Sequence, residues 1–477
     1  MRNVADGVEV GTDAGREVED PATLEVVDSV EVCAPEGIDQ TVRAARAAFP
    51  GWAASGEDRQ AALTRVSAVL ASHEDELAIL LSREQGKPLA QAYQEFRGSR
   101  RILDWYAALA DADEILRETP EERVLTKLTP IGVVGMITPW NFPITILGMK
   151  LWATLRAGNT TVIKPASTTP LSTLRMVQLI AEVLPPGVVN TVTGSGAVGQ
   201  HLASHPLVDK VSFTGSTEVG REVMRAATPG LKRLTLELGG NDPAILLDDV
   251  DLDAALPMIL RSAFHNAGQV CQAIKRVMVP RHLYGDVVDG LVTLANESFV
   301  VGRGLTEGVT MGPVNNFAQR ETVRGLVADA RKRGAIVHTV GRRIDADLPG
   351  YFLMPTIVAG VEADWPLAAT EQFGPSLPLV AYDDLDRTIA DLNAGEFGLD
   401  ASVWGRDEDA AIDASLRLEV GQSFVNTHAG PPDPLIPFGG VKGSGFGREL
   451  GLQGLEEASQ LRVLKVHRAS VPATVGR

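Results

Sequence analysis

The sequence has few cysteines and no excess of positive charge, and both shortages exclude classes of protein. Two cysteines, Cys33 and Cys271, occur in 477 residues, which is too few for the disulfide framework of a secreted domain. With 61 acidic and 44 basic side chains the net charge is -17, which repels nucleic acids and anionic lipid surfaces. We therefore expect a cytoplasmic protein with no nucleic-acid and no membrane partner.

Long apolar runs are also scarce. The N-terminal stretch is acidic and lacks the apolar segment after a basic start that marks a signal peptide. Residues 133–155 are apolar enough to resemble a membrane span, but Pro139, Asn141, Pro143 and Lys150 interrupt them. A buried strand, loop and helix is the better interpretation.

The length of the chain and its alternation of strand-like and helix-like segments predict several α/β units. A chain of 477 residues exceeds what one hydrophobic core normally supports. From Gly132, β-branched runs alternate with helical patterns, and a second such series runs from residue 242 to residue 428. Such alternation indicates parallel sheets covered on both faces. No repeat, low-complexity block or Gly/Ser linker separates the units, so we expect them to pack closely.

Seven short segments place polar or reactive residues among glycines and prolines, where backbone can approach a ligand. They are PWNFP (139–143), VIKPAS (162–167), FTGSTEVG (213–220), LELGG (236–240), GQVC (268–271), EQFGP (371–375) and PFGGVKGSGFGRE (437–449). In this order and spacing they resemble the aldehyde dehydrogenase superfamily over about residues 15 to 465. Each segment alone is a weak signal, but the set is specific.

This resemblance implies a fold and a division of the chain. The fold would be α/β, with a Rossmann-like cofactor domain, a second α/β catalytic domain and a small β oligomerisation element. The cofactor domain would comprise residues 1–111 and 132–237, the catalytic domain 238–436, and the oligomerisation element 112–131 and 455–477. Relatives of this kind form homodimers or homotetramers, and the sequence does not choose between them.

Cys271 is the candidate nucleophile, because a thiolate is the strongest nucleophile among the side chains. A lone cysteine is more often an inert core residue, and Cys33, in a strand-like run, keeps that interpretation. GQVC is polar and contains glycine, unlike a core strand. The resemblance implies that Cys271 attacks an aldehyde and forms a thiohemiacetal and then a thioester.

Four further residues would complete the catalytic site by resemblance. Glu237 would be the general base that activates water, which favours hydrolysis over transfer to coenzyme A. Asn141, with the N–H of Cys271, would form the oxyanion hole, and Lys150 and Glu449 would relay protons. Taken singly, Glu237 would more often be a surface acid at a strand end, and Asn141 would more often be a turn-forming residue.

The resemblance also implies a NAD or NADP site. Its residues would be Thr138, Pro139, Trp140, Lys164, Ser167, Gly215, Ser216, Gly220, Leu238, Glu371 and Phe373. Ser167 stands where many NAD-preferring relatives have a glutamate, so a 2′-phosphate would not be repelled and NADP should be accepted. The glycines of TGSGAVG (193–199) match a dinucleotide fingerprint, but no carboxylate ends a second strand about 20 residues later. Thr370 and Asn241 depart from the family pattern without removing a catalytic group.

Two rival functions and a metal site are the alternatives to this hypothesis. His201 and His205 have metal-site spacing, but no third ligand follows, and no metal is expected. Cys271 with His265 or His428 could form a cofactor-independent thiol hydrolase, and the chain could also be a catalytically silent binding protein.

By the same resemblance, the positions that line the aldehyde tunnel carry few aromatic rings, which favours a small or polar aldehyde. They are Phe142, Thr145, Met149, His265 and Pro431–Pro432–Asp433.

Overall fold

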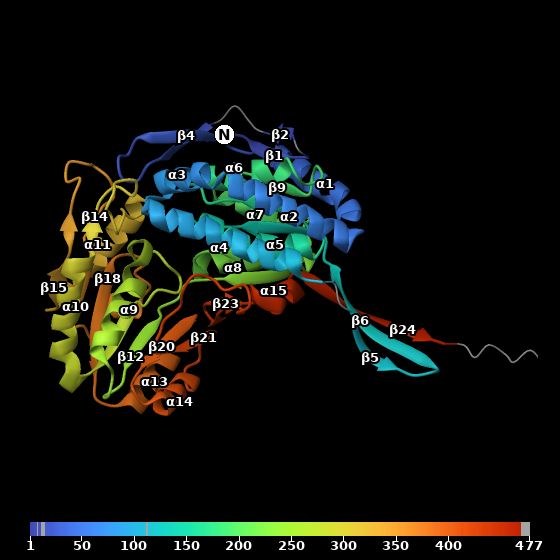
Figure 1. The fold of residues 1–477 in the computed structure, drawn as a ribbon. Coiled ribbons are helices and arrows are strands. Elements are labelled where there is room, and N and C mark those ends of the chain that lie inside the picture. The colour runs from blue at the N-terminus through green and yellow to red at the C-terminus, as the bar shows by residue number, and fades with distance from the viewer. Residues whose placement is uncertain (7, 11–14, 111–112, 469–477) are drawn as a thin grey trace, which may run out of the picture.

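The structure is a computed structural model that describes residues 1–6, 8–10, 15–110 and 113–468. Two α/β bodies lie against each other, and a narrow arm of strands projects from one of them (Figure 1). Among the described residues, no helix is both long enough and apolar enough to cross a membrane.

The first body is built on a six-stranded sheet in the order β23-β11-β10-β7-β8-β9. Its strands are β7 (Val133–Ile137), β8 (Thr160–Lys164), β9 (Val189–Thr191), β10 (Lys210–Thr214), β11 (Arg233–Glu237) and β23 (Gly445–Phe446). All pairings are parallel except that of β23 with β11. Every residue of β7, β8 and β10 is buried, because helices cover both faces.

Two layers of helices enclose this sheet. On one face, α1 (Pro35–Ala53), α7 (Gly196–Ser204) and α8 (Thr217–Ala227) pack on alternate strand residues such as Val133 and Val211. On the other face lie α5 (Pro143–Arg156) and α6 (Leu171–Ala181), covered in turn by α2 (Gly56–Ser72), α3 (Glu74–Gln85) and α4 (Leu89–Ala108). The predicted strand, loop and helix over 133–155 is confirmed as β7 and α5.

The second body contains a seven-stranded sheet in the order β15-β17-β18-β13-β12-β20-β21. Its strands are β12 (Pro243–Leu246), β13 (Arg276–Pro280), β15 (Ile336–Thr339), β17 (Thr356–Ala359), β18 (Ser376–Tyr382), β20 (Asp400–Trp404) and β21 (Gln422–Val425), and only β15 runs antiparallel to its neighbour. One face packs on α9 (Leu252–Phe264) and α10 (Tyr284–Ser298). The other packs on α11 (Phe317–Lys332), α12 (Pro366–Ala369), α13 (Leu385–Asn393) and α14 (Glu408–Leu416). The predicted α/β fold class is confirmed.

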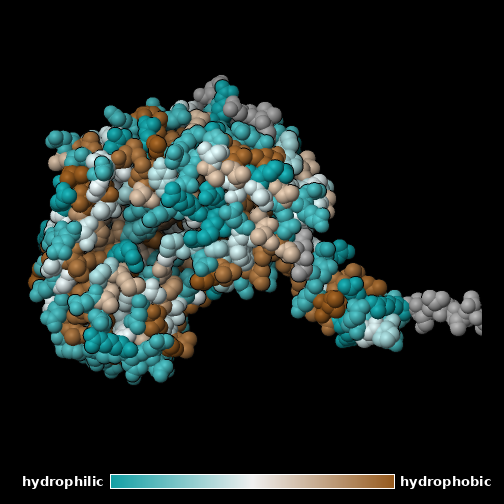
Figure 2. Space-filling view, viewed as in Figure 1, coloured by the Kyte–Doolittle hydropathy of each residue, from teal (hydrophilic) through white to brown (hydrophobic). Residues whose placement is uncertain are grey.

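A three-stranded antiparallel sheet forms the arm. It consists of β5 (Glu114–Glu118), β6 (Glu122–Pro130) and β24 (Ser459–His467), with β6 in the centre. These strands fall within the ranges expected to oligomerise, of which residues 112 and 469–477 lie outside the described residues. Apolar side chains are exposed on the arm (Figure 2): Ile115, Leu116, Leu461, Val463, Leu464 and Val466.

The remaining elements are short. They are β1 (Asn3–Ala5), β2 (Val8–Val10), β3 (Gly15–Glu19), β4 (Val26–Glu31), β14 (Val300–Val301), β16 (Arg342–Arg343), β19 (Phe397–Gly398), β22 (Val441–Lys442), α15 (Gly451–Glu457) and three 3-10 helices, Thr228–Gly230, His265–Gly268 and Arg281–Leu283.

One connection positions the site. Residues 238–242 run directly from the end of β11 in the first sheet to the start of β12 in the second. The carboxyl edge of the first sheet therefore faces the amino edge of the second, and polar residues at both edges can meet.

Candidate active site

Segments far apart in the sequence converge at this junction. Glu237 is the last residue of β11, Cys271 lies shortly before β13, and Glu371 lies shortly before β18. A Cβ added at Gly240 would lie 3.0 Å from the Cys271 carbonyl oxygen, and one at Gly239 would lie 2.4 Å from Glu371 Oε2. The glycine pair thus lets both loops approach the end of β11, as predicted for a segment where backbone lies near reactive groups.

The loop that carries Cys271 is sharply folded. Asn266 and Ala267 adopt left-handed backbone angles, with φ of 49° and 56°, which non-glycine residues seldom adopt. Gln269 Nε2 donates to the Asn266 carbonyl at 2.8 Å, and Asn266 Nδ2 donates to the Asn141 carbonyl at 3.0 Å. These bonds fix the loop, and the Cys271 side chain remains partly accessible.

The electrostatic environment of Cys271 is mixed. Burial raises the pKa of its thiol, and the charges of Glu237, Asp242 and Asp400 raise it further, whereas the charge of Lys275 lowers it. The thiol therefore needs a base or a cation to become a thiolate.

Glu237 is suited to act as a base near neutral pH. It is buried, and the pKa of its carboxyl group is raised to about 8, first by burial and then by the charge of Glu449, while Lys150 opposes the rise. Lys150 Nζ lies 2.5 Å from Glu449 Oε1 and donates to Ser212 Oγ at 3.2 Å. The structure thus brings together Glu237, Lys150 and Glu449, three residues that the sequence pattern connects only by resemblance.

Glycines of the segment 437–449 let the chain pass beside Glu237. A Cβ at Gly439 would lie 3.0 Å from Glu237 Oε1, and one at Gly445, where φ is +109°, would lie 1.9 Å from the Leu236 carbonyl oxygen. These glycines therefore permit close packing of the chain against β11 and Glu237.

Asn141 faces the same loop from the other body. Its Nδ2 donates to the Gln269 carbonyl at 2.9 Å, two residues before Cys271. Its own carbonyl accepts from Lys87 Nζ at 2.9 Å, and Lys87 pairs with Glu95 Oε2 at 2.5 Å. This places a fixed N–H₂ donor near Cys271, as an oxyanion hole requires.

The carboxyl edge of the first sheet carries polar groups that fit a nucleotide. Thr138 Oγ1 and Thr214 Oγ1, at the ends of β7 and β10, are buried and have no partner among the described residues. Lys164 Nζ, at the end of β8, donates to the Pro165 carbonyl at 3.1 Å, and burial together with the charge of Arg16 lowers its pKa to about 8. Doubly wound sheets bind dinucleotides at this edge, and free hydrogen-bond donors there suit such a ligand.

The predicted cofactor residues fall into two groups. Ser167 Oγ donates to the Gly194 carbonyl at 3.1 Å, so the TGSGAVG loop lies beside Lys164. In the second group, Trp140 and Phe373 have ring centroids 5.3 Å apart, next to Pro139 and Glu371. Lys164 ends β8, and Glu371 lies beside Gly239, just after β11. β8 lies three strand positions from β11, about 14 Å at about 4.8 Å per strand. An elongated ligand reaching from Lys164 to Glu371 fits this separation.

The loop after β10 lies between the two groups. Ser216 caps α8 by accepting from the Val219 N–H at 3.4 Å. A Cβ at Gly220 would lie 2.5 Å from Leu238 Cδ2, and one at Gly215 would lie 2.5 Å from the Phe213 ring. The glycines therefore permit close helix–sheet packing under the helix N-terminus, where phosphate binds favourably.

Neither candidate histidine of the hydrolase hypothesis is a suitable base. Burial lowers the pKa of His265 to about 4, and its ring stacks on Phe142 with centroids 5.7 Å apart. His428 has a pKa lowered to about 3 by burial, and its two ring nitrogens contact Ser402 Oγ at 2.8 Å and the Gln272 carbonyl at 3.1 Å.

His201 and His205 both face Asp39, at 2.8 Å and 3.3 Å. No cluster with the makings of a metal site occurs in the part of the chain that the structure describes.

Several site residues escaped the sequence analysis. Lys87 and Glu95 fix Asn141 and the start of α5, where Glu95 Oε1 accepts from the Ile144 and Thr145 N–H groups at 2.8 Å and 3.0 Å. Lys275 and Gln372 tie the Cys271 loop to the Glu371 loop. Lys275, next to the start of β13, carried a signal in the sequence, a charge beside a buried strand, whereas Lys87, Glu95 and Gln372 do not adjoin a strand end in that way.

Comparisons with known proteins agree with this geometry. The model of the aldehyde dehydrogenase family matches residues 9–464. The succinate-semialdehyde dehydrogenase [NADP(+)] of Escherichia coli strain K12 is 38% identical over 454 residues, covering 94% of this chain and 93% of that protein. A glutarate-semialdehyde dehydrogenase of Pseudomonas aeruginosa is 38% identical over 467 residues, 96% of each chain. The crystal structure of an E. coli NADP-dependent enzyme superposes with a TM-score of 0.93 at 36% identity, covering 98% of each chain.

Proposed function

Because the chain belongs to the aldehyde dehydrogenase family and is an NAD(P)-dependent oxidoreductase acting on an aldehyde, we propose that Cys271 is its nucleophile and Glu237 its general base. The predicted family and reaction class are confirmed. The observation that carries the residue roles is the meeting of Cys271, Glu237 and the Asn141 amide at the junction of the two sheets, beside Glu371.

The residues account for each step of the reaction. The Cys271 thiolate attacks the aldehyde carbon and forms a thiohemiacetal, whose developing negative charge the Asn141 N–H₂ group stabilises. Glu371 and Phe373 would hold a bound nicotinamide, which would supply the hydride acceptor. Loss of hydride from the thiohemiacetal carbon leaves a thioester on Cys271. Glu237 then takes a proton from water, whose oxygen attacks the thioester carbon; the C–S bond breaks, the acid forms and Cys271 leaves as the thiolate. Glu237 is restored when it passes its proton on toward the Lys150–Glu449 pair.

Replacing the nucleophile tests this proposal. Cys271→Ala should lose formation of reduced nicotinamide with every aldehyde, while Cys33→Ala keeps it. Intact-mass spectrometry of acid-quenched parent enzyme should show the acyl adduct, and the Cys271→Ala protein should not. Normal turnover without Cys271 would overturn the mechanism. Cys271-dependent ester hydrolysis, with no reduced nicotinamide formed from any aldehyde, would favour the thiol hydrolase.

We propose that the enzyme accepts NADP. Lys164 and Arg16 lie together near Ser167, and no carboxylate is among the groups whose charges shift the Lys164 pKa. Two cations and no acid at this point attract a 2′-phosphate. The measurement is kcat/KM for NADP and NAD with one aldehyde, and strong exclusion of NADP would contradict the proposal.

We propose a small, uncharged aldehyde as substrate. In the predicted tunnel, His265 is neutral above its pKa of about 4, and Lys87 is neutralised by Glu95. Arg101, at the rim, donates to the Pro432 carbonyl at 2.9 Å. The two curated relatives are named for semialdehydes that carry a carboxylate, whereas Arg101 and Arg261, cations near the predicted tunnel in the described part of the chain, are exposed. A higher kcat/KM for succinate semialdehyde than for butanal would refute this substrate class.

We further propose that the arm joins copies of the chain into a dimer or tetramer, because apolar residues lie on both faces of β24. We place the division between the cofactor-binding and catalytic domains near residue 238. We also propose a cytoplasmic location, because a reducing compartment suits the free thiol of Cys271.

A further inference from the structure

Lys275 holds a buried ammonium group directly behind the nucleophile. Its Nζ donates to three carbonyl groups of the Cys271 loop: Val270 at 2.6 Å, Cys271 at 2.8 Å and Ala273 at 3.3 Å. The side chain is 3% exposed. A charge at this depth costs several kcal/mol unless it is paired and fully hydrogen-bonded, so the three carbonyls and the nearby carboxylates account for its presence.

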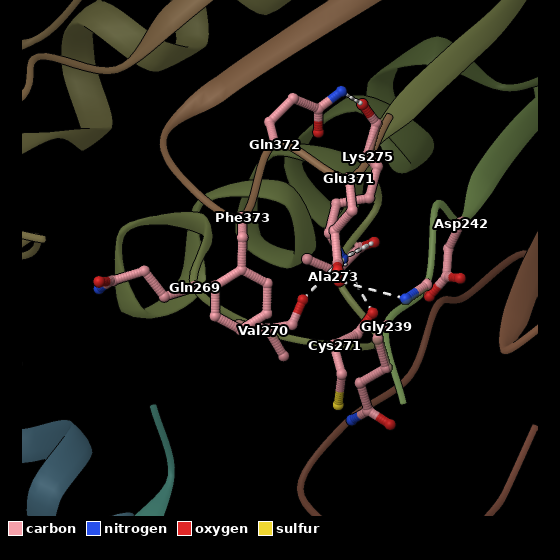
Figure 3. A network of polar contacts seen from close by, with 12 residues as sticks. Gly239, Asp242, Gln269, Val270, Cys271, Ala273, Lys275, Glu371, Gln372 and Phe373 are labelled. Carbon is pink, nitrogen blue, oxygen red and sulfur yellow. Dashed lines mark hydrogen bonds and ion pairs between the residues drawn. The ribbon is translucent and has the colours of Figure 1, made fainter. Parts of the chain in front are cut away.

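Lys275 also joins the nucleophile loop to the loop of Glu371. Its Nζ lies 3.9 Å from Glu371 Oε1, and its carbonyl accepts from Gln372 Nε2 at 3.1 Å. Glu371 Oε1 in turn accepts from the Gly240 N–H at 3.1 Å. Figure 3 shows Lys275 between the carbonyls of the Cys271 loop and Glu371, with the Cys271 sulfur on the opposite side of that loop.

We propose that Lys275 is a positioning residue of the proposed reaction: its ammonium fixes the Cys271 loop beside Glu371, and its charge stabilises the Cys271 thiolate. The inference rests on the role assigned to Cys271 above. The charges that face this thiol come from four segments. Glu237 ends β11, Asp242 precedes β12 and Asp400 begins β20, and all three oppose ionisation of the thiol. The charge of Lys275, before β13, favours it.

The test is the pH dependence of Cys271 alkylation by iodoacetamide in a Cys33→Ser background, because only the thiolate reacts. Lys275→Met removes the charge and the hydrogen bonds, Lys275→Gln removes the charge but keeps a donor, and Lys275→Arg keeps both. We expect the midpoint to rise by about one pH unit in Lys275→Met and Lys275→Gln, which is about tenfold slower alkylation below the midpoint. Lys275→Arg should titrate like the parent.

Lys232→Met is the matched control, because Lys232 Nζ also donates to main-chain carbonyls, those of His205 and Val208, away from the active site. It should leave the midpoint unchanged. An unshifted midpoint in Lys275→Gln and Lys275→Met, or an equal shift in Lys275→Arg, would overturn the proposal. Alkylation requires neither aldehyde nor turnover, so this outcome is distinguishable from a failure of the dehydrogenase mechanism, which Cys271→Ala tests.

Discussion

The buried ion pair beside the proposed general base should set the pH dependence of thioester hydrolysis. Glu449 raises the pKa of Glu237 and Lys150 lowers it. Lys150→Met and Glu449→Gln should therefore shift the pH profile of hydrolysis in opposite directions, although each breaks the same 2.5 Å contact. A purely structural pair would not give opposite signs.

The size of each shift follows from the position of the charges. A charge within about 6 Å changes a carboxyl pKa by about 1 to 3 units, and the parent pKa of Glu237 is about 8. We expect a midpoint of about 9 or above in Lys150→Met and of about 7 or below in Glu449→Gln. Since hydrolysis needs the carboxylate form of Glu237, the rate rises with pH through each midpoint. At pH 8, Lys150→Met should hydrolyse the thioester about fivefold more slowly than the parent.

The assay separates acylation from hydrolysis. A rapid burst of reduced nicotinamide reports formation of the thioester, and the decay of the acyl-enzyme mass after quenching reports its hydrolysis. Both are followed from about pH 6 to about pH 10. Glu237→Gln should lose the pH-dependent limb and serves as the reference for an absent base.

Folding must be checked, because removing one member of a buried ion pair costs about 3 to 5 kcal/mol. Thermal unfolding of each variant therefore accompanies the kinetics. The electrostatic account of Glu237 would be refuted if the pH midpoints of Lys150→Met and Glu449→Gln both equalled that of the parent, or if both moved in the same direction.

Four further predictions concern other parts of the molecule. Asn141→Ala should lower kcat by about 10² to 10³ fold as an oxyanion donor is lost, and an unchanged kcat would exclude that role. Ser167→Glu should lower kcat/KM for NADP at least about tenfold while sparing NAD, because like charges repel; equal losses with both cofactors would speak against it. Leu461→Asp should dissociate the oligomer, which light scattering would detect as a lower mass. A parent protein that is already monomeric would disprove the role of the arm. Gly445→Ala should lower Tm, since its Cβ would meet the Leu236 carbonyl at 1.9 Å, whereas Gly325→Ala, with nothing within 4 Å, should not.

The sequence predicts the fold well where a single local rule decides. Strands buried on both faces show as continuous β-branched runs, so both sheets could be expected, and the interrupted apolar stretch at 133–155 forms the strand and helix that were expected. Candidate site residues were found where a reactive side chain stands among glycines or prolines, as for Cys271 and Glu237. Their closeness in the fold came from the family resemblance, since the order of strands within a sheet is not a local property.

The residues that were missed act through contacts that sequence spacing does not reveal. Lys87 reaches the Asn141 carbonyl across 54 positions, and Gln372 reaches the Lys275 carbonyl across 97. The carbonyls that surround Lys275 belong to a loop that follows Asn266 and Ala267, whose left-handed backbone angles neither residue type predicts. From the sequence alone, a lysine that precedes an apolar strand is expected to be a surface residue. Its burial follows from the arrangement of the neighbouring strands, which the sequence does not give.

The five residues between β11 and β12 both connect the two bodies and lie directly beside the candidate active site. A tilt of one body against the other would separate the Glu237 carboxyl from the Cys271 sulfur, because the two residues lie on different bodies. It would also disturb the core of the first body, which includes Leu399 and contacts Cys271 of the second body. Loss of activity in this protein therefore reports how the two bodies are placed against each other.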